Sequence, residues 1–177
     1  MNSELIELRP AEGRDCKALA SIHSAAWLGA YRGLLNGIEL DRMIARRSPA
    51  WWQGALSKGV QIKVLDVAGE PAGYATFGSS RIPLMAGAGE IYELYLKPEY
   101  QGLGFGRKLF ETVRKDLAVR HPKGLAIQVL SENGPARAFY QALGGQLIPT
   151  TTQVSPMSRL ELSVYFWSGV YRQPSRK

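Results

Sequence analysis

Cysteine and histidine are scarce in this chain of 177 residues. The single cysteine, Cys16, cannot form an internal disulfide, and this fits a reducing compartment, so we expect a cytoplasmic protein. No fixed spacing relates His23 or His121 to Cys16, which gives no support to a cysteine nucleophile. Because one cysteine and two histidines offer no metal-ligand pattern either, we expect no metal site.

Long hydrophobic runs are also lacking, and none approaches the length of a membrane span. The first residues include Glu4 and Glu7 and show no signal-peptide pattern, so we expect no membrane partner. Linkers, internal repeats and low-complexity segments are absent as well. The composition, 45% hydrophobic and 21% charged, is that of a globular protein with a sizeable core. We expect one domain over residues 1–172 and a mobile tail over 173–177.

The net charge of +7 raises the question of an anionic partner. The basic residues are scattered, and no dense basic run or basic-aromatic array stands out, so nucleic acid is not the favoured partner. A polyanionic cofactor explains the charge equally well. Salt-dependent binding of DNA or RNA would distinguish the nucleic-acid alternative.

Hydrophobic periodicity and turn residues predict the order strand, helices, three strands, helix, strand, helix, two strands. The expected strands cover residues 4–9, 60–67, 72–78, 90–96, 125–130, 146–154 and 159–167. The expected helices cover residues 15–31, 38–44, 49–56, 104–120 and a short segment capped by Asn133 that ends at Gly144.

A glycine-rich stretch, Gln101-Gly102-Leu103-Gly104-Phe105-Gly106, lies between the 90–96 strand and the 104–120 helix. Glycine permits backbone conformations closed to other residues, and a helix start directs several N–H groups toward an anion. We therefore expect a phosphate or pyrophosphate site here. Neither the Walker A pattern nor the dinucleotide fingerprint fits, because Arg107 stands where each requires its later glycine.

With the preceding Leu94-Tyr95-Leu96-Lys97-Pro98, this stretch resembles the acetyl-CoA-binding segment of the GNAT N-acetyltransferase superfamily. A second segment, Asn133 to Gly144, resembles the N-x-x-A-x-x-F-Y-x-x-x-G pattern of the same family. The resemblance implies an α/β (α+β) GNAT fold. Its central sheet would be mixed and mostly antiparallel, with about seven strands flanked by helices and splayed at the central strands. It also implies acetyl-CoA as co-substrate, without a metal.

The resemblance implies where acetyl-CoA would bind. The backbone N–H groups of Gly102, Leu103, Gly104, Phe105 and Gly106 would hold the pyrophosphate, with Gln101 bracing the turn. Arg107 would add charge near the phosphates, or would simply lie on a solvated helix face. The pantetheine arm would run along Leu94, Tyr95 and Leu96, and Asn133 would contact it, cap a helix, or do both.

Amine acetylation requires a neutral amine and a leaving thiolate. Glu93 and Glu90 are the candidate proton acceptors, and we favour Glu93 because it lies closer to the expected splay. The alternative for each is a solvated or structural glutamate. Tyr140 lies where the family places its tyrosine acid, beside the sulfur.

The resemblance favours direct attack on acetyl-CoA in a ternary complex. Trp27, Tyr31, Arg32 and Met85 are candidate acceptor contacts. The sequence leaves open whether the acceptor is a small amine, a peptide N-terminus or a protein lysine. It also leaves open whether the chain forms a homodimer. The alternative function is a catalytically weak acetyl-CoA-binding domain that acts as a sensor or interaction module.

Overall fold

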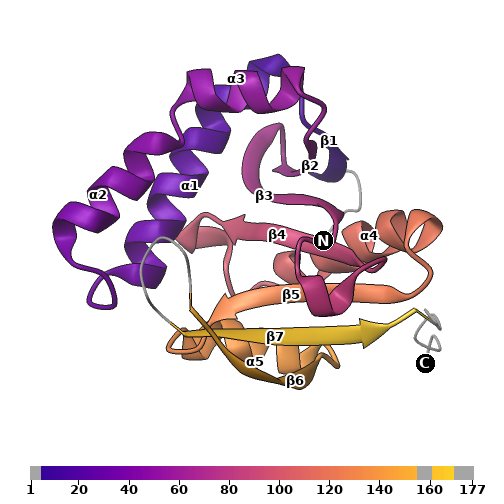
Figure 1. Cartoon of the computed structure of the whole chain (residues 1–177). Helices are drawn as coiled ribbons and strands as arrows, with labels where there is room; N and C mark the ends of the chain where they lie inside the picture. The colour runs from indigo at the N-terminus through magenta and orange to yellow at the C-terminus, as the bar shows by residue number, and fades with distance from the viewer. Residues whose placement is uncertain (1–4, 155–160, 170–177) are drawn as a thin grey trace. The chain divides into compact units, whose positions relative to one another are not determined.

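The computed structural model describes residues 5–154 and 161–169 (Figure 1). Glu4, residues 159–160 of the last predicted strand and the predicted tail lie outside these ranges. The strands are β1 (Ile6–Pro10), β2 (Gln61–Val67), β3 (Glu70–Ser79), β4 (Gly89–Leu96), β5 (Gly124–Leu130), β6 (Gln146–Val154) and β7 (Glu161–Ser168). The helices are α1 (Cys16–Tyr31), α2 (Gly37–Arg46), α3 (Pro49–Ser57), α4 (Phe105–Arg120) and α5 (Gly134–Ala142).

The order of elements agrees with the prediction from the sequence, and their ends lie within about two residues of the predicted ones. The strands form one sheet in the order β1-β2-β3-β4-β5-β7-β6. The β1–β2, β2–β3, β5–β7 and β6–β7 pairs are antiparallel. The β4–β5 pair is parallel and joins Gly89–Ile91 to Leu125–Ile127. The predicted mixed, mostly antiparallel sheet is therefore confirmed.

The chain divides into two compact units, and β4 contributes residues to both. The first comprises Met1–Phe77 and Tyr92–Thr112, and the second comprises Gly78–Ile91 and Val113–Lys177. Glu93 and the glycine-rich stretch thus belong to the first unit, whereas Glu90, Asn133 and Tyr140 belong to the second.

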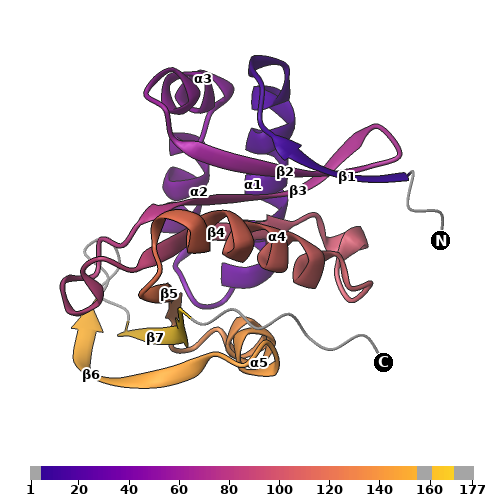
Figure 2. The same ribbon diagram turned by 90° about the vertical axis from the view of Figure 1, so that its right-hand side faces the viewer.

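The core of the first unit forms between its helices and the antiparallel strands β2 and β3. Figures 1 and 2 show α1, α2 and α3 gathered on one side of β2 and β3. Leu19 and Ile22 of α1 and Trp52 of α3 are fully buried against Val64 and Tyr74 of the two strands. Apolar residues at helical spacing on α1 and alternating residues on the strands explain this packing. The Asn36 and Ser48 side chains cap α2 and α3, which fixes where each helix begins.

The second unit is built around β5 and β7. These strands pair from Gly124↔Ser168 to Leu130↔Leu162, and Figure 1 shows α5 beside them. Ile82, Ala126 and Val164 are buried together there, with Met85 packed against them.

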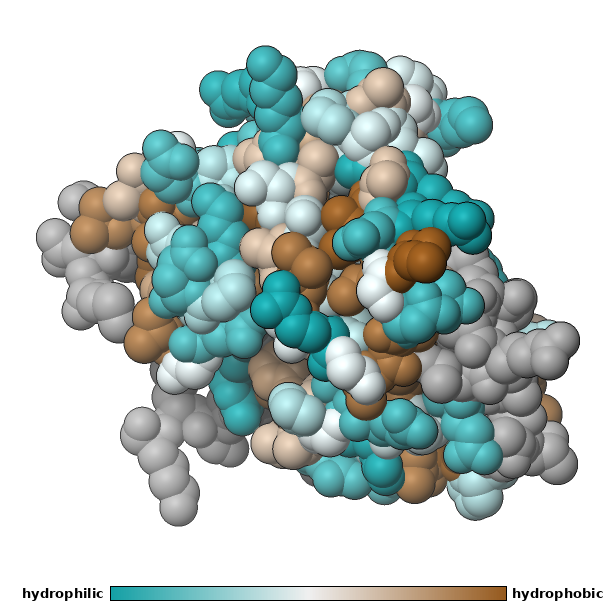
Figure 3. Space-filling model, turned by 90° about the vertical axis from the view of Figure 1, so that its left-hand side faces the viewer, coloured by the Kyte–Doolittle hydropathy of each residue, from teal (hydrophilic) through white to brown (hydrophobic). Residues whose placement is uncertain are grey.

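Exposed large apolar residues occur in both units. On the face that Figure 3 presents, hydrophobic side chains are interspersed with hydrophilic ones. The most exposed large apolar residues, Ile38, Leu84 and Val119, come from separate segments of the sequence. Within the described ranges, no helix has the length and apolar character needed to cross a membrane.

Candidate functional site

The glycine-rich stretch connects β4 to α4 in the first unit. A short 3-10 helix, Pro98–Tyr100, follows β4, and the side-chain Nε2 of Gln101 donates to the carbonyl oxygen of Leu96 at 3.1 Å. This hydrogen bond ties the turn to the end of β4. Gly102 and Gly104 adopt φ angles of 74° and 82°, a region that other residues rarely adopt. An added Cβ at either position would meet no atom within 4 Å, so backbone conformation rather than space requires these glycines.

Several N–H groups at the start of α4 have no assigned acceptor in the described part of the chain. The first hydrogen bond of the helix runs from the Lys108 N–H to the Gly104 carbonyl oxygen at 3.2 Å. Among the described residues, no acceptor is assigned to the backbone N–H groups of residues 102–107. Together with the helix dipole, they form a site suited to phosphate oxygens. The Arg107 side chain is 54% exposed and pairs with Glu111 at 3.7 Å, as on a solvated helix face.

Glu93 lies on the half of β4 that belongs to the first unit. Its Oε1 accepts a hydrogen bond from Nη2 of Arg47 at 2.6 Å, and its Oε2 accepts one from the Tyr74 hydroxyl at 3.2 Å. The Glu93 side chain is only 10% exposed. It is thus a nearly buried carboxylate that accepts hydrogen bonds from the side chains of Arg47 and Tyr74.

Tyr74 connects Glu93 to the buried imidazole of His23. Nδ1 of His23 lies 3.0 Å from the Tyr74 hydroxyl oxygen. Because that hydroxyl donates to Glu93, Nδ1 must carry the proton that the oxygen accepts, which assigns the tautomer. Burial first, and the charge of Arg47 second, lower the pKa of His23 to about 3, so the ring is neutral. Burial, followed by the nearby Glu93 carboxylate, raises the pKa of Tyr74.

The neutral His23 ring leaves Nε2 as an acceptor, and this atom is buried with no partner among the described residues. The indole N–H of Trp27 is a buried donor that likewise has no partner among the described residues. The two rings lie 4.9 Å apart, and Trp27 also contacts Tyr31 at 4.7 Å. The Tyr31 and Tyr95 hydroxyls are hydrogen-bonded at 3.1 Å. The structure therefore brings the predicted residues Trp27, Tyr31 and Tyr95 into one aromatic cluster.

Glu90, the other candidate proton acceptor, has a different environment in the second unit. Its Oε2 accepts a 2.6 Å hydrogen bond from the backbone N–H of Arg81, and its Oε1 accepts one from the Arg81 guanidinium at 3.3 Å. The side chain is 2% exposed. Glu90 thus fastens the loop between β3 and β4.

Tyr140 and Asn133 lie on and before α5. The Tyr140 ring is 7% exposed and packs against Tyr165 and Trp167, with centroid distances of 6.3 and 6.1 Å. The Asn133 side chain accepts a hydrogen bond from the Ala136 N–H at 3.2 Å, so the helix-cap role is observed.

The other two predicted acceptor contacts are not part of the aromatic cluster. Arg32 is exposed at the C-terminal end of α1, and Met85 packs on the core of the second unit.

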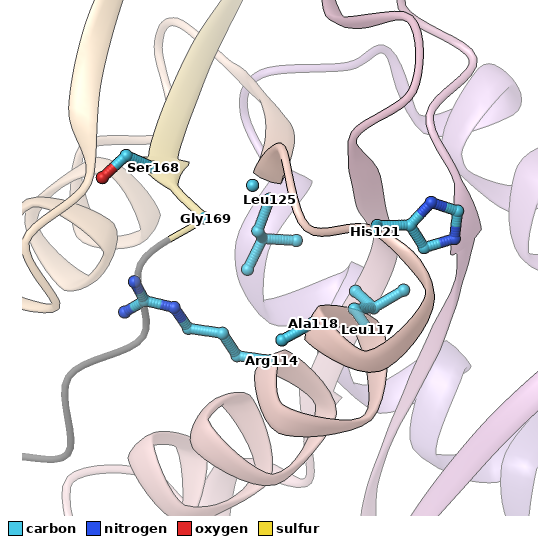
Figure 4. A pocket seen from close by; sticks show the side chains of 8 residues that line it. Arg114, Leu117, Ala118, His121, Leu125, Ser168 and Gly169 are labelled. Atoms are coloured by element: carbon cyan, nitrogen blue, oxygen red, sulfur yellow. The ribbon is translucent and has the colours of Figure 1, made fainter.

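A pocket in the second unit contains none of the predicted residues. It lies at the end of α4 and is lined by Arg114, Leu117, Ala118, His121, Leu125 and Ser168, among others. Figure 4 shows the His121 ring pointing away from Leu125. No cluster of three metal-binding side chains occurs within residues 5–154 and 161–169.

Comparison with known proteins adds a finding that decides the family. The sequence model of the acetyltransferase (GNAT) family matches residues 18–145, which include the glycine-rich stretch and the Asn133–Gly144 segment. The chain belongs to the GNAT acetyltransferase family.

Individual relatives agree with membership of the GNAT family. The chain is 28% identical over 138 residues to the uncharacterized N-acetyltransferase YuaI of Bacillus subtilis (strain 168), covering 78% of this chain and 79% of YuaI. It is 27% identical over 139 residues to the L-amino acid N-acyltransferase MnaT of Escherichia coli (strain K12), covering 78% of each protein.

Solved structures share the GNAT fold. The PaiA N-acetyltransferase of Thermoplasma acidophilum in complex with coenzyme A superposes with a TM-score of 0.75 at 18% identity, over 92% of this chain and 99% of that one. The yncA structure from Salmonella typhimurium with acetyl-CoA gives a TM-score of 0.67 at 22% identity, over 97% of this chain and 98% of that one.

Sequence reasoning missed Arg47 and Tyr74, which contact Glu93 in this GNAT chain, and His23, which contacts Tyr74. Arg47 is one of many scattered basic residues, and Tyr74 reads as an ordinary strand residue. His23 belongs to no recognisable sequence pattern and has no fixed spacing to Cys16. Arg47 contacts Glu93, which lies 46 residues away in the sequence, and His23 contacts Tyr74, which lies 51 residues away. No local sequence pattern indicates such contacts.

Proposed function

We propose that this chain transfers the acetyl group of acetyl-CoA to a primary amine by direct attack within a ternary complex. The observation that carries the proposal is the row of N–H groups at residues 102–107, to which no acceptor is assigned among the described residues. A pyrophosphate offers the negative oxygens that such a row lacks. Membership of the GNAT family and the coenzyme A complexes of its structural relatives support acetyl-CoA as the ligand.

The rest of the cofactor would follow the first-unit half of β4. The pantetheine arm has amide groups that can pair with the backbone of Leu94, Tyr95 and Leu96. The parallel pairing of β4 with β5 covers Gly89–Ile91, and β4 continues to Leu96. An extended backbone segment is a suitable partner for an amide-bearing chain. Asn133 is proposed as a further contact in addition to its observed capping role.

The acceptor reaches the protein as an ammonium, because an alkyl amine with a pKa near about 10.4 is almost wholly protonated at neutral pH. In the proposed reaction Glu93 takes one proton, directly or through a water, and the free nitrogen lone pair attacks the thioester carbon. The tetrahedral intermediate collapses, the C–S bond breaks, and the nitrogen loses its second proton. The products are the amide, coenzyme A as its thiol and one released proton.

Tyr140 is proposed to protonate the leaving sulfur. Its support is its place in the Asn133–Gly144 pattern shared with the family. Tyr140→Phe keeps the ring packing and removes only the hydroxyl, so kcat should fall about a hundredfold while acetyl-CoA affinity stays the same. A wild-type kcat across the pH range, in an assay limited by chemistry, would remove Tyr140 from the mechanism.

The experiment that tests acetyl-CoA binding compares two glycines of the same conformation. Gly104 and Gly59 have φ angles of 82° and 78°, and an added Cβ meets no atom within 4 Å at either. Valine at each position should cost similar stability, on the order of 1–2 kcal/mol. Acetyl-CoA should raise the melting temperature of the wild type and of Gly59→Val by mass action, but not that of Gly104→Val.

An equal shift in both variants would mean that the phosphates bind elsewhere. Turnover is then measured by release of the coenzyme A thiol with a panel of amines, and the acetylated product is identified by mass spectrometry. Acetyl-CoA binding without transfer to any amine would favour the alternative, a sensor or interaction module.

A further inference from the structure

The ion pair between Arg47 and Glu93 lies at the proposed proton acceptor. Arg47 directly follows α2 and reaches Glu93 through one nitrogen, Nη2, at 2.6 Å. Its guanidinium carbon lies 3.8 Å from the ring centroid of Trp51, an indole that is 38% exposed. The Arg47 side chain itself is 28% exposed, so part of it is in contact with solvent.

A second ion pair of the first unit provides an internal comparison. Arg9 holds Asp15 with two parallel hydrogen bonds of 2.8 and 2.9 Å, and these side chains are 12% and 3% exposed. Such a bidentate, buried pair is geometrically specific and strong. The Arg47 guanidinium makes one such bond, and no other acceptor is assigned to that side chain in the described part of the chain. Arg47 therefore keeps unused donors in its planar fork.

An acceptor ammonium that binds Oε1 of Glu93 must share that oxygen with the Arg47 guanidinium or displace it, because the guanidinium already donates to one of its two lone pairs. A simple cationic amine would in either case lie next to a second positive charge. An acceptor that carries its own carboxylate beside the ammonium avoids this repulsion, because the guanidinium can move from Glu93 to the incoming carboxylate. The charges then alternate along the line Glu93, ammonium, carboxylate, Arg47.

We propose that the acceptor is a free α-amino acid whose carboxylate is bound by Arg47 and whose ammonium is bound by Glu93. The inference rests on the proposed function, since it names the acceptor class of that same site. Arg47 is then the residue that determines specificity. The planar fork of arginine matches a carboxylate with two parallel bonds, and Trp51 offers the guanidinium a surface on which to stack during the exchange.

The test compares three forms of one molecule. A panel of free amino acids is first screened with acetyl-CoA, and the best one is then compared with its carboxamide and its decarboxylated amine. For the wild type, kcat/KM should be at least about tenfold higher for the free acid than for either analogue, as expected when one charged contact is lost. Arg47→Gln should remove this preference by lowering kcat/KM for the acid, and Arg47→Lys should restore part of it.

Arg42→Gln serves as the matched control. Arg42 is exposed on α2, so the substitution removes the same charge from the same helical segment without touching Glu93. It should keep the preference for the free acid. If the wild type and Arg47→Gln acetylate the acid, the amide and the amine with the same ratios, the inference is overturned while the proposed acetyl transfer stands.

A binding measurement keeps the two proposals separable. Calorimetric titration of the protein saturated with coenzyme A should show tighter binding of the free acid than of its amide. Arg47→Gln should abolish this difference in affinity. That result without any turnover would support the carboxylate site and reject acetyl transfer. Absence of the difference in the wild type would overturn the inference.

Discussion

The two glutamates of β4 differ in the groups that hold their carboxylates. Glu90 is held by the backbone N–H and the guanidinium of Arg81, and it fastens a loop in the second unit. Glu93 is held by the side chains of Arg47 and Tyr74 in the first unit. A backbone N–H cannot leave its acceptor without moving the chain, whereas side chains can rotate away. The comparison favours Glu93 as the carboxylate that exchanges partners and Glu90 as a fixed anchor.

The largest expected effect is the loss of activity in Glu93→Gln. The amide keeps the size of the side chain but cannot take a proton from the acceptor, so kcat/KM should fall about a hundredfold or more at neutral pH. Steady-state kinetics with saturating acetyl-CoA measure the effect, and the melting temperature of the free protein is the control. A variant with wild-type kinetics in an assay limited by chemistry would exclude Glu93 as the base.

Glu90→Ala should show the opposite behaviour. Removing the carboxylate leaves the Arg81 N–H without its recorded acceptor, and the free energy of unfolding should fall by about 1–3 kcal/mol. Urea denaturation measures this loss. Kinetic constants of the folded fraction should change much less than in Glu93→Gln. If Glu90→Ala instead abolishes turnover at unchanged stability, the roles of the two glutamates are reversed.

The difference between these residues also marks the limit of what the sequence predicts. Periodicity and turn residues predict the elements because both depend on neighbours along the chain. The glycine-rich stretch is predictable for the same reason, since its conformation depends on Gly102 and Gly104 themselves. Glu93 was favoured over Glu90 from its place in the strand, but its link to Arg47 depends on how α2 packs. That packing is a property of the folded chain and leaves no local pattern.

The smallest expected effect concerns the residue that supports Glu93 through Tyr74. Burial lowers the pKa of His23 to about 3 in the folded protein, compared with an ordinary value of 6.5. Below pH 6.5 the unfolded chain binds a proton at His23, and the folded chain does not until about pH 3. Acidification through this window therefore favours unfolding, by up to about 1.4 kcal/mol for each pH unit.

His23→Gln removes this titration while its amide can still donate to the Tyr74 oxygen. The free energy of unfolding, measured by urea denaturation of both proteins from pH 7 to pH 5, should fall less steeply in the variant, by about 1 kcal/mol per pH unit. Other acid-sensitive groups cancel in the difference, including Asp15, whose pKa is lowered by its hydrogen bonds to Arg9. Parallel curves for the two proteins would mean that His23 titrates normally in the folded state. In that case the imidazole of His23 is charged at mildly acidic pH, and it lies two hydrogen bonds from the Glu93 carboxylate through Tyr74. The comparison between Glu93 and Glu90 would then have to include the charge of His23.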